Sequence, residues 1–168
     1  MNWVFIVLIL LAIVGSMMWM MPSPRQRAQA LLRQKAMRLG IQVQISRLLF
    51  PRALGEAVAD ERDCTAYRLA RTQDRRRGRQ APVPWQIFKV RSHANTGLPE
   101  GWSWGRGEGQ LTSEQLALIA GLIEILPADV YALESTPVSA GVYWNEHGDL
   151  DTVDLVFENL EKMLEANL

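Results

Sequence analysis

An unbroken apolar stretch precedes every charged residue of the chain. From Trp3 to Met21 there is no charge over nineteen positions. A helix of that length measures about 28 Å at about 1.5 Å per residue, close to the hydrocarbon thickness of a bilayer. Trp3 and Trp19 lie near its ends, where aromatic rings favour the headgroup boundary. No basic residue precedes the stretch and no Ala-x-Ala site follows it, so the pattern predicts a retained transmembrane anchor over residues 1–21.

A polar, basic helix is predicted directly after the anchor, over residues 22–40. Ser23 and Gln26 form the Ser-x-x-Gln pattern of a capping box, Pro24 suits the first helical position, and Gly40 suits a left-handed stop. The helix carries no acidic residue and these basic ones: Arg25, Arg27, Arg33, Lys35 and Arg38. The positive-inside rule therefore places the N-terminus outside and the C-terminal part in the cytoplasm, with the anchor in a bacterial inner membrane.

The remaining segment, residues 41–168, mixes the periodicities of strands and helices. Ile41, Val43 and Ile45 alternate with polar residues, which predicts a strand with one wet face over 41–48. The same kinds of signal predict the other elements, which are strands at 64–71, 84–92, 130–134 and 138–144, and helices at 112–126 and 151–164. The turn-rich segment before the 112–126 helix leaves open a further short strand at 102–104. The order α-βββ-α-ββ-α after the anchor predicts an α+β fold, with a mainly antiparallel sheet and helices on one face.

Two groups of apolar residues are candidates for a protein interface. The helix after Thr112 is apolar nearly all round, which predicts either burial on most sides or a dimer face. Tryptophans outside the anchor pack on the core or, where they are exposed, suit a partner, since aromatic side chains dominate binding at interfaces. The candidate interface residues are Trp102, Trp104, Leu118, Leu122 and Ile125.

The order of elements after residue 21 resembles that of the type III secretion chaperones. Those proteins are small cytoplasmic dimers, and a long central helix helps to form the dimer. The layout of one N-terminal span followed by a cytoplasmic domain is also similar to that of the small accessory subunit of the bacterial Sec translocase. Both resemblances rest on layout and on no sequence motif, and both imply a protein-binding role.

The net charge of zero conceals a division along the chain. Residues 22–91 hold sixteen basic and five acidic side chains, a balance of +11, whereas residues 92–168 hold two basic and thirteen acidic ones, a balance of −11. The densest part of the basic half is a predicted loop with Arg75, Arg76, Arg77 and Arg79. Such asymmetry indicates a charged partner, either anionic lipid or an acidic protein surface. The alternative is that the two halves interleave and pair their charges locally.

One acidic segment is a candidate for chemistry. Glu146, His147, Asp149, Asp151 and Asp154 cluster in sequence, as in a metal site or an acid–base pair. The simpler interpretation is a turn at Gly148 and a helix capped by Asp151.

The other candidate signals for an enzyme are weaker. Two histidines exclude a three-His metal site within one chain. No nucleophile motif such as G-x-S-x-G occurs, and the single Cys64 suits a small buried residue in a reducing compartment. We therefore expect neither an enzyme nor a cofactor.

The leading hypothesis is a non-catalytic inner-membrane protein, held by residues 3–21, whose cytoplasmic domain over 41–168 binds a protein partner or a second copy. One alternative is a tethered binder of anionic lipid or nucleic acid that uses the arginine loop, although nucleic acid is less expected because no binding module is evident. Another is a tethered enzyme or metal binder that uses the Glu146–Asp154 segment.

Overall fold

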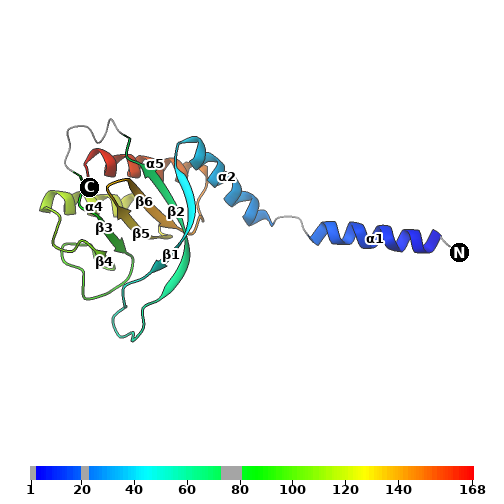
Figure 1. Cartoon of the computed structure of the whole chain (residues 1–168), viewed down its shortest axis with the longest axis horizontal. Helices are drawn as coiled ribbons and strands as arrows, with labels where there is room; N and C mark the ends of the chain where they lie inside the picture. The colour runs from blue at the N-terminus through cyan, green and yellow to red at the C-terminus, as the bar shows by residue number, and fades with distance from the viewer. Residues whose placement is uncertain (1–2, 20–22, 73–80) are drawn as a thin grey trace.

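The segments predicted as strands form one antiparallel sheet in the computed structural model (Figure 1). The structure describes residues 3–19, 23–72 and 81–168, with residues 16–19 described by their backbone alone. Within these ranges the elements are α1 (Trp3–Trp19), α2 (Pro24–Arg38), β1 (Gln42–Leu49), β2 (Glu61–Ala70), β3 (Trp85–Phe88), β4 (Ser103–Arg106), α4 (Ser113–Ile125), β5 (Val130–Ser135), β6 (Ser139–Trp144) and α5 (Leu150–Glu165). The prediction of an α+β fold with a mainly antiparallel sheet is confirmed, and the element order roughly matches the predicted one, with β4 as a fourth strand before α4.

The strand order across the sheet is β1-β2-β6-β5-β3-β4, so the hairpin of β5 and β6 lies in the middle. The turn between them is closed by Thr136, whose hydroxyl oxygen accepts from the backbone N–H groups of Val138 and Ser139 at 3.3 and 3.0 Å. The hairpin lies between β2, which pairs with β6, and β3, which pairs with β5, and both strands precede it by more than 40 residues. The centre of the sheet therefore joins segments far apart in the chain.

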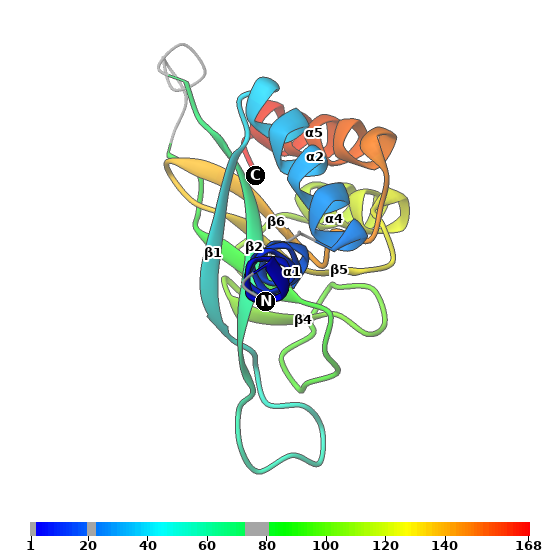
Figure 2. The ribbon, with the colours of Figure 1, turned by 90° about the vertical axis from the view of Figure 1, so that its right-hand side faces the viewer.

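The helices α2, α4 and α5 cover one face of the sheet (Figure 2). Tyr67 and Trp144 form the middle of this core, with their rings edge-on at 5.3 Å and both side chains fully buried. Leu32 from α2, Ile119 from α4 and Val156 from α5 pack onto the same cluster. The local signals at the helix starts are confirmed, since the capping boxes at Ser23 and Thr112 are both formed.

The opposite face of the sheet carries a row of polar contacts at its centre. Arg68 on β2 and Glu134 on β5 flank Gly141 on β6 in register, and Arg68 Nε donates to Glu134 Oε1 at 2.7 Å. Arg68 also donates to the hydroxyl of Tyr143 at 2.7 Å and lies over its ring. A Cβ at position 141 would lie 2.9 Å from Cγ of Glu134. The ion pair can therefore bridge two strands only because residue 141 lacks a side chain.

Three details differ from the sequence-based expectations. The alternation predicts Ile45 on a buried face, but the Ile45 side chain is 73% exposed. The strand β1 lies at the edge of the sheet, and Val43, two residues earlier on it, still packs on the helix-side core. The final helix is capped by Asp149, not Asp151, since the Asp149 carboxylate accepts from the N–H of Thr152 at 2.9 Å. Helix α4 buries one side alone, with Ile119 and Leu122 buried.

Helix α1 lies apart from the sheet and its helices (Figure 1). It holds 17 residues, none of them charged in its first or last turn. The large apolar side chains described for this helix are all exposed, the least being Val7 at 40% and the most Trp3 at 71%. Within the described residues, no helix has both the length and the apolarity that crossing a membrane requires.

Substitution of Gly141 by alanine tests the role of the polar row. The added Cβ would clash with Glu134 and push it from Arg68, so we expect a loss of about 1–3 kcal/mol in the free energy of unfolding, the usual cost of overpacking. Gly121→Ala on α4 is the matched control, because a Cβ there meets nothing within 4 Å. Urea unfolding of the full chain in detergent, followed by tryptophan fluorescence, measures both. Equal stability of the two variants would contradict the expectation.

Candidate functional site

A buried carboxylate holds helix α2 against the end of the sheet. Glu146 follows β6, and its Oε1 accepts from Arg33 Nε at 2.7 Å and from the Tyr67 hydroxyl at 2.9 Å. Its Oε2 accepts from Arg33 Nη2 at 2.6 Å, so the arginine binds in bidentate fashion. The Glu146 side chain is 2% exposed and that of Arg33 is 37% exposed. Glu146 also has a φ of 57°, a conformation uncommon outside glycine, which the surrounding contacts maintain.

The electrostatics of this group favour the usual charge states of Arg33 and Tyr67. The hydrogen bond and charge of Glu146 raise the pKa of Arg33. Burial raises the pKa of Tyr67 well above its ordinary value, and the adjacent Glu146 charge raises it further. Tyr67 is therefore a neutral donor to a carboxylate, and the arrangement suits fastening better than proton transfer.

Two further residues of the acidic segment, His147 and Asp154, also contact α2. Lys35 Nζ lies 2.5 Å from Asp154 Oδ2 on α5 and donates to the backbone oxygen of Leu150 at 2.8 Å. Arg25 Nη2 lies 2.9 Å from His147 Nε2. The backbone N–H of His147 donates to Asp129 at 3.0 Å. Of the residues considered for a metal or an acid–base pair, Glu146, His147 and Asp154 thus contact the basic helix.

The described residues contain no group of three or more His, Cys, Asp or Glu side chains placed to hold a metal ion. Asp149 is engaged locally as the cap of α5, and its hydrogen bonds with Thr152 lower its pKa.

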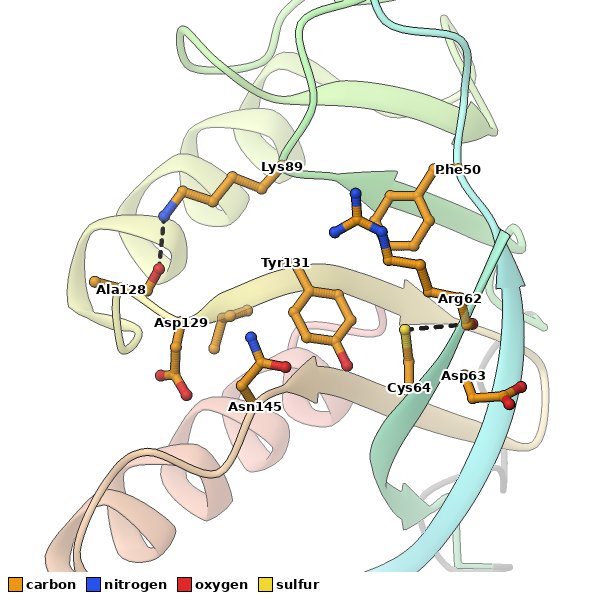
Figure 3. A pocket seen from close by; sticks show the side chains of 10 residues that line it. Phe50, Arg62, Asp63, Cys64, Lys89, Ala128, Asp129, Tyr131 and Asn145 are labelled. Atoms are coloured by element: carbon orange, nitrogen blue, oxygen red, sulfur yellow. Dashed lines mark hydrogen bonds between the residues drawn. The ribbon is translucent and has the colours of Figure 1, made fainter. Parts of the chain in front are cut away.

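A cavity of about 310 Å³ opens at the end of the sheet near the β2 start (Figure 3). Its lining comes from several elements and consists of Phe50, Arg62, Asp63, Cys64, Lys89, Ala128, Asp129, Val130, Tyr131 and Asn145. Burial raises the pKa of the Cys64 thiol, while the nearby Tyr131 hydroxyl lowers it by a smaller amount. The thiol therefore stays protonated at neutral pH, the less reactive form. Lys89 is engaged with the backbone oxygen of Ala128 at 2.8 Å.

The basic residues predicted to contact lipid or an acidic partner divide into three sets. Arg25, Arg33 and Lys35 are bonded to the domain, as described above. Arg27 and Arg38 are exposed and have no ion-pair or hydrogen-bond partner among the described residues. The arginines of the predicted loop, which are Arg75, Arg76, Arg77 and Arg79, lie outside the described residues. Of the two tryptophans at the ends of α1, Trp3 is exposed, and the Trp19 side chain lies outside the description.

The two charge halves meet in space at several points. Ion pairs that join a basic residue of 22–91 to an acidic residue of 92–168 are Arg33–Glu146, Lys35–Asp154, Arg68–Glu134 and Arg91–Glu100. These pairs agree with the alternative in which the basic and acidic halves interleave and pair their charges locally. On α2, by contrast, Arg27 and Arg38 have no partner among the described residues, and both lie on the same side of the helix.

The candidate interface residues are separated by the fold. Trp102, Trp104 and Leu122 are buried in the helix-side core, so they are not accessible to a partner. Leu118 and Ile125 remain on the outer side of α4, at 37% and 50% exposure. They lie seven residues apart and therefore on one stripe of the helix.

Comparison with known proteins gives no relative from which a role can be transferred. No family model matches the chain. No curated protein and no solved structure matches it either.

Removal of Arg33 tests the fastening of α2. Arg33→Met leaves Glu146 buried without its cation, and we expect a loss of about 2–3 kcal/mol, less than for a fully buried pair because Arg33 is partly exposed. Glu146→Gln in the same chain should restore part of the loss, so the double-mutant cycle should show coupling. Lys35→Met, at a more exposed pair, should cost less than about 1 kcal/mol. Additive effects of the Arg33 and Glu146 substitutions in urea unfolding would contradict the assignment.

Proposed function

We propose that this protein is a non-catalytic, membrane-anchored interaction module of the bacterial inner membrane. Helix α1 anchors the chain in the bilayer, and the α+β domain lies at the cytoplasmic surface, where it binds a protein partner. The observation that carries the proposal is the exposure of the described apolar side chains of α1, a helix that lies apart from the domain in Figure 1. Exposure of so large an apolar surface to water is unfavourable, and large exposed apolar patches mark protein or membrane interaction sites.

The length of α1 is compatible with insertion at the lower limit. Its 17 residues measure about 26 Å at about 1.5 Å per residue. Spanning helices range from about 17 to 25 residues, and bilayers thin locally around short ones. The uncharged run also continues in sequence to Met21. Burial of each large apolar side chain in hydrocarbon is favourable by about 1.5–3 kcal/mol.

The charge of α2 supports the proposed orientation. All five of its charged residues are basic. Basic residues close to a span remain on the cytoplasmic side. The partner-binding role is supported by the outer side of α4, where Leu118 and Ile125 flank Gly121 on one stripe. A Cβ at position 121 would meet nothing within 4 Å, so a partner helix has close access to the backbone there.

The alternatives have less support. The enzyme hypothesis depends on the Glu146–Asp154 segment, where Glu146, His147 and Asp154 contact α2 and Asp149 caps α5. The nucleic-acid hypothesis depends on arginines that lie outside the described residues.

Arginine substitutions in α1 test the anchor. Leu8→Arg with Leu11→Arg places two charges mid-helix, each costing about 2.5–3.5 kcal/mol on insertion, so the fraction that resists carbonate extraction should fall at least about 100-fold. Leu118→Arg on α4 is the matched control and should remain in the membrane fraction. Retention of the double variant would contradict the anchor. A reporter fused after Leu168 that is active outside the cytoplasm would contradict the orientation.

Photo-crosslinking tests the partner-binding face. A photoreactive residue at position 118 should form a discrete adduct in intact membranes, because Leu118 is exposed on α4. The same residue at Glu165, an exposed position at the end of α5, is the control. Identical adducts from both positions, or none from position 118, would contradict the assignment of this face.

A further inference from the structure

The geometry points to a lipid-binding face on α2, distinct from the face that docks on the domain. This face comprises Arg27, Leu31, Gln34 and Arg38 together with Leu150 of α5, and we call it the outward stripe. We propose that it lies in the headgroup layer of the bilayer that holds α1, and that Arg27 and Arg38 bind the phosphates of anionic lipids. The inference rests on the proposed anchoring and specifies which basic residues meet the membrane.

The helical positions separate two functions of α2. At about 100° per residue, Arg27, Leu31, Gln34 and Arg38 fall within about 60° of one another. All four are exposed. Leu32 and Ala36 lie on the opposite side and are buried in the core. The helix α2 therefore has one face buried against the domain and an opposite face that is exposed.

The basic residues of α2 also fall into two groups, those that contact the domain and those on the outward stripe. Arg33 and Lys35 form ion pairs with Glu146 and Asp154, so their charge is already compensated by the domain. Arg25 contacts His147. The cations left without a partner among the described residues of α2 are Arg27 and Arg38, one at each end of the outward stripe. Compensated cations attract anionic lipid weakly, so these two carry the attraction.

The stripe also has the apolar component of an interfacial helix. A groove of about 380 Å³ runs between α2 and the start of α5 and is lined by Leu31, Gln34, Lys35, Arg38, Leu39 and Leu150. Leu31 and Leu150 are exposed despite their apolar side chains. Helices that lie at a membrane surface combine such side chains with arginines, whose aliphatic stems reach along the apolar surface while their charges meet the phosphates.

Chain connectivity selects lipid over an acidic protein as the occupant. Four residues separate Trp19 of α1 from Pro24 of α2. Fully extended, this link reaches about 17 Å. If α1 is in the bilayer, the first turn of α2 therefore stays close to the headgroups, where anionic lipids of the cytoplasmic leaflet attract basic residues. Figure 2 shows α2 on the side of the domain from which α1 extends.

A fluorescence experiment on the full chain in lipid nanodiscs tests the inference. Gln34→Cys with Cys64→Ala allows one environment-sensitive fluorophore to be attached at the centre of the stripe. The discs contain phosphatidylcholine alone or a mixture with phosphatidylglycerol. We expect a blue shift and quenching by headgroup-level quenchers in the anionic discs, and weaker effects in the neutral ones.

Charge reversal in the same label background identifies the residues responsible. Arg27→Glu with Arg38→Glu should weaken the docked state by more than roughly thirty-fold, because the loss of two cations accounts for that factor and the two added carboxylates are repelled by the anionic surface. Arg52→Glu with Arg106→Glu changes the net charge equally at exposed sites outside α2 and should have little effect. Arg27→Gln with Arg38→Gln is a milder variant, and tryptophan fluorescence confirms that each variant is folded.

The outcomes distinguish this inference from the proposed anchoring. A chain that fails to co-elute with the discs overturns both. A chain that co-elutes but gives the same signal in neutral and anionic discs, or whose Arg27 and Arg38 variants behave like the control, overturns the lipid face alone. A blue shift that appears in native membranes and not in purified discs also overturns it and indicates an acidic protein as the occupant.

Discussion

The bidentate contact of Arg33 with the buried carboxylate of Glu146 connects the first helix of the domain to the segment that follows its last strand. Glu146 is at a chain reversal after the last strand, and Arg33 is in the middle of the first helix of the domain. Tyr67, from the second strand, completes the contact and packs against Trp144 in the core. Because a buried carboxylate without a cation is costly, this contact fixes α2 on the sheet. Four residues of chain separate α2 from α1, which limits the distance between the two helices.

The ion pairs of the fold change the interpretation of the charge division along the chain. In sequence, the basic and acidic halves suggest that one whole half faces a charged surface. In the fold, Glu134, Glu146 and Asp154 compensate Arg68, Arg33 and Lys35 within the domain. What remains on α2 is a narrow surface with Arg27 and Arg38. A neutral protein can thus present a local cationic face without a basic domain.

The polar residues that suggested chemistry participate in the architecture. Glu146 and Asp154 hold α2, and Asp149 begins α5. The Arg68–Glu134 pair crosses β6 where Gly141 leaves room for it. Cys64 lines a cavity, but burial keeps its thiol protonated. Glu134, Glu146 and Asp154 therefore each join segments of the domain that are distant in sequence.

The sequence by itself determined the local elements. Ser23 with Gln26, and Thr112 with Gln115, are signals between residues three apart, so the starts of α2 and α4 were predictable from the chain alone. The alternation at 41–48 likewise predicted β1, but not that Ile45 would lie on an edge that the core does not cover. Only the tertiary structure decided that Leu122 and Trp104 are buried while Leu118 is exposed, and that Arg33 is paired while Arg27 is not. Burial and charge compensation depend on which distant segments meet, and residues 33 and 146 are joined by packing that no local pattern encodes.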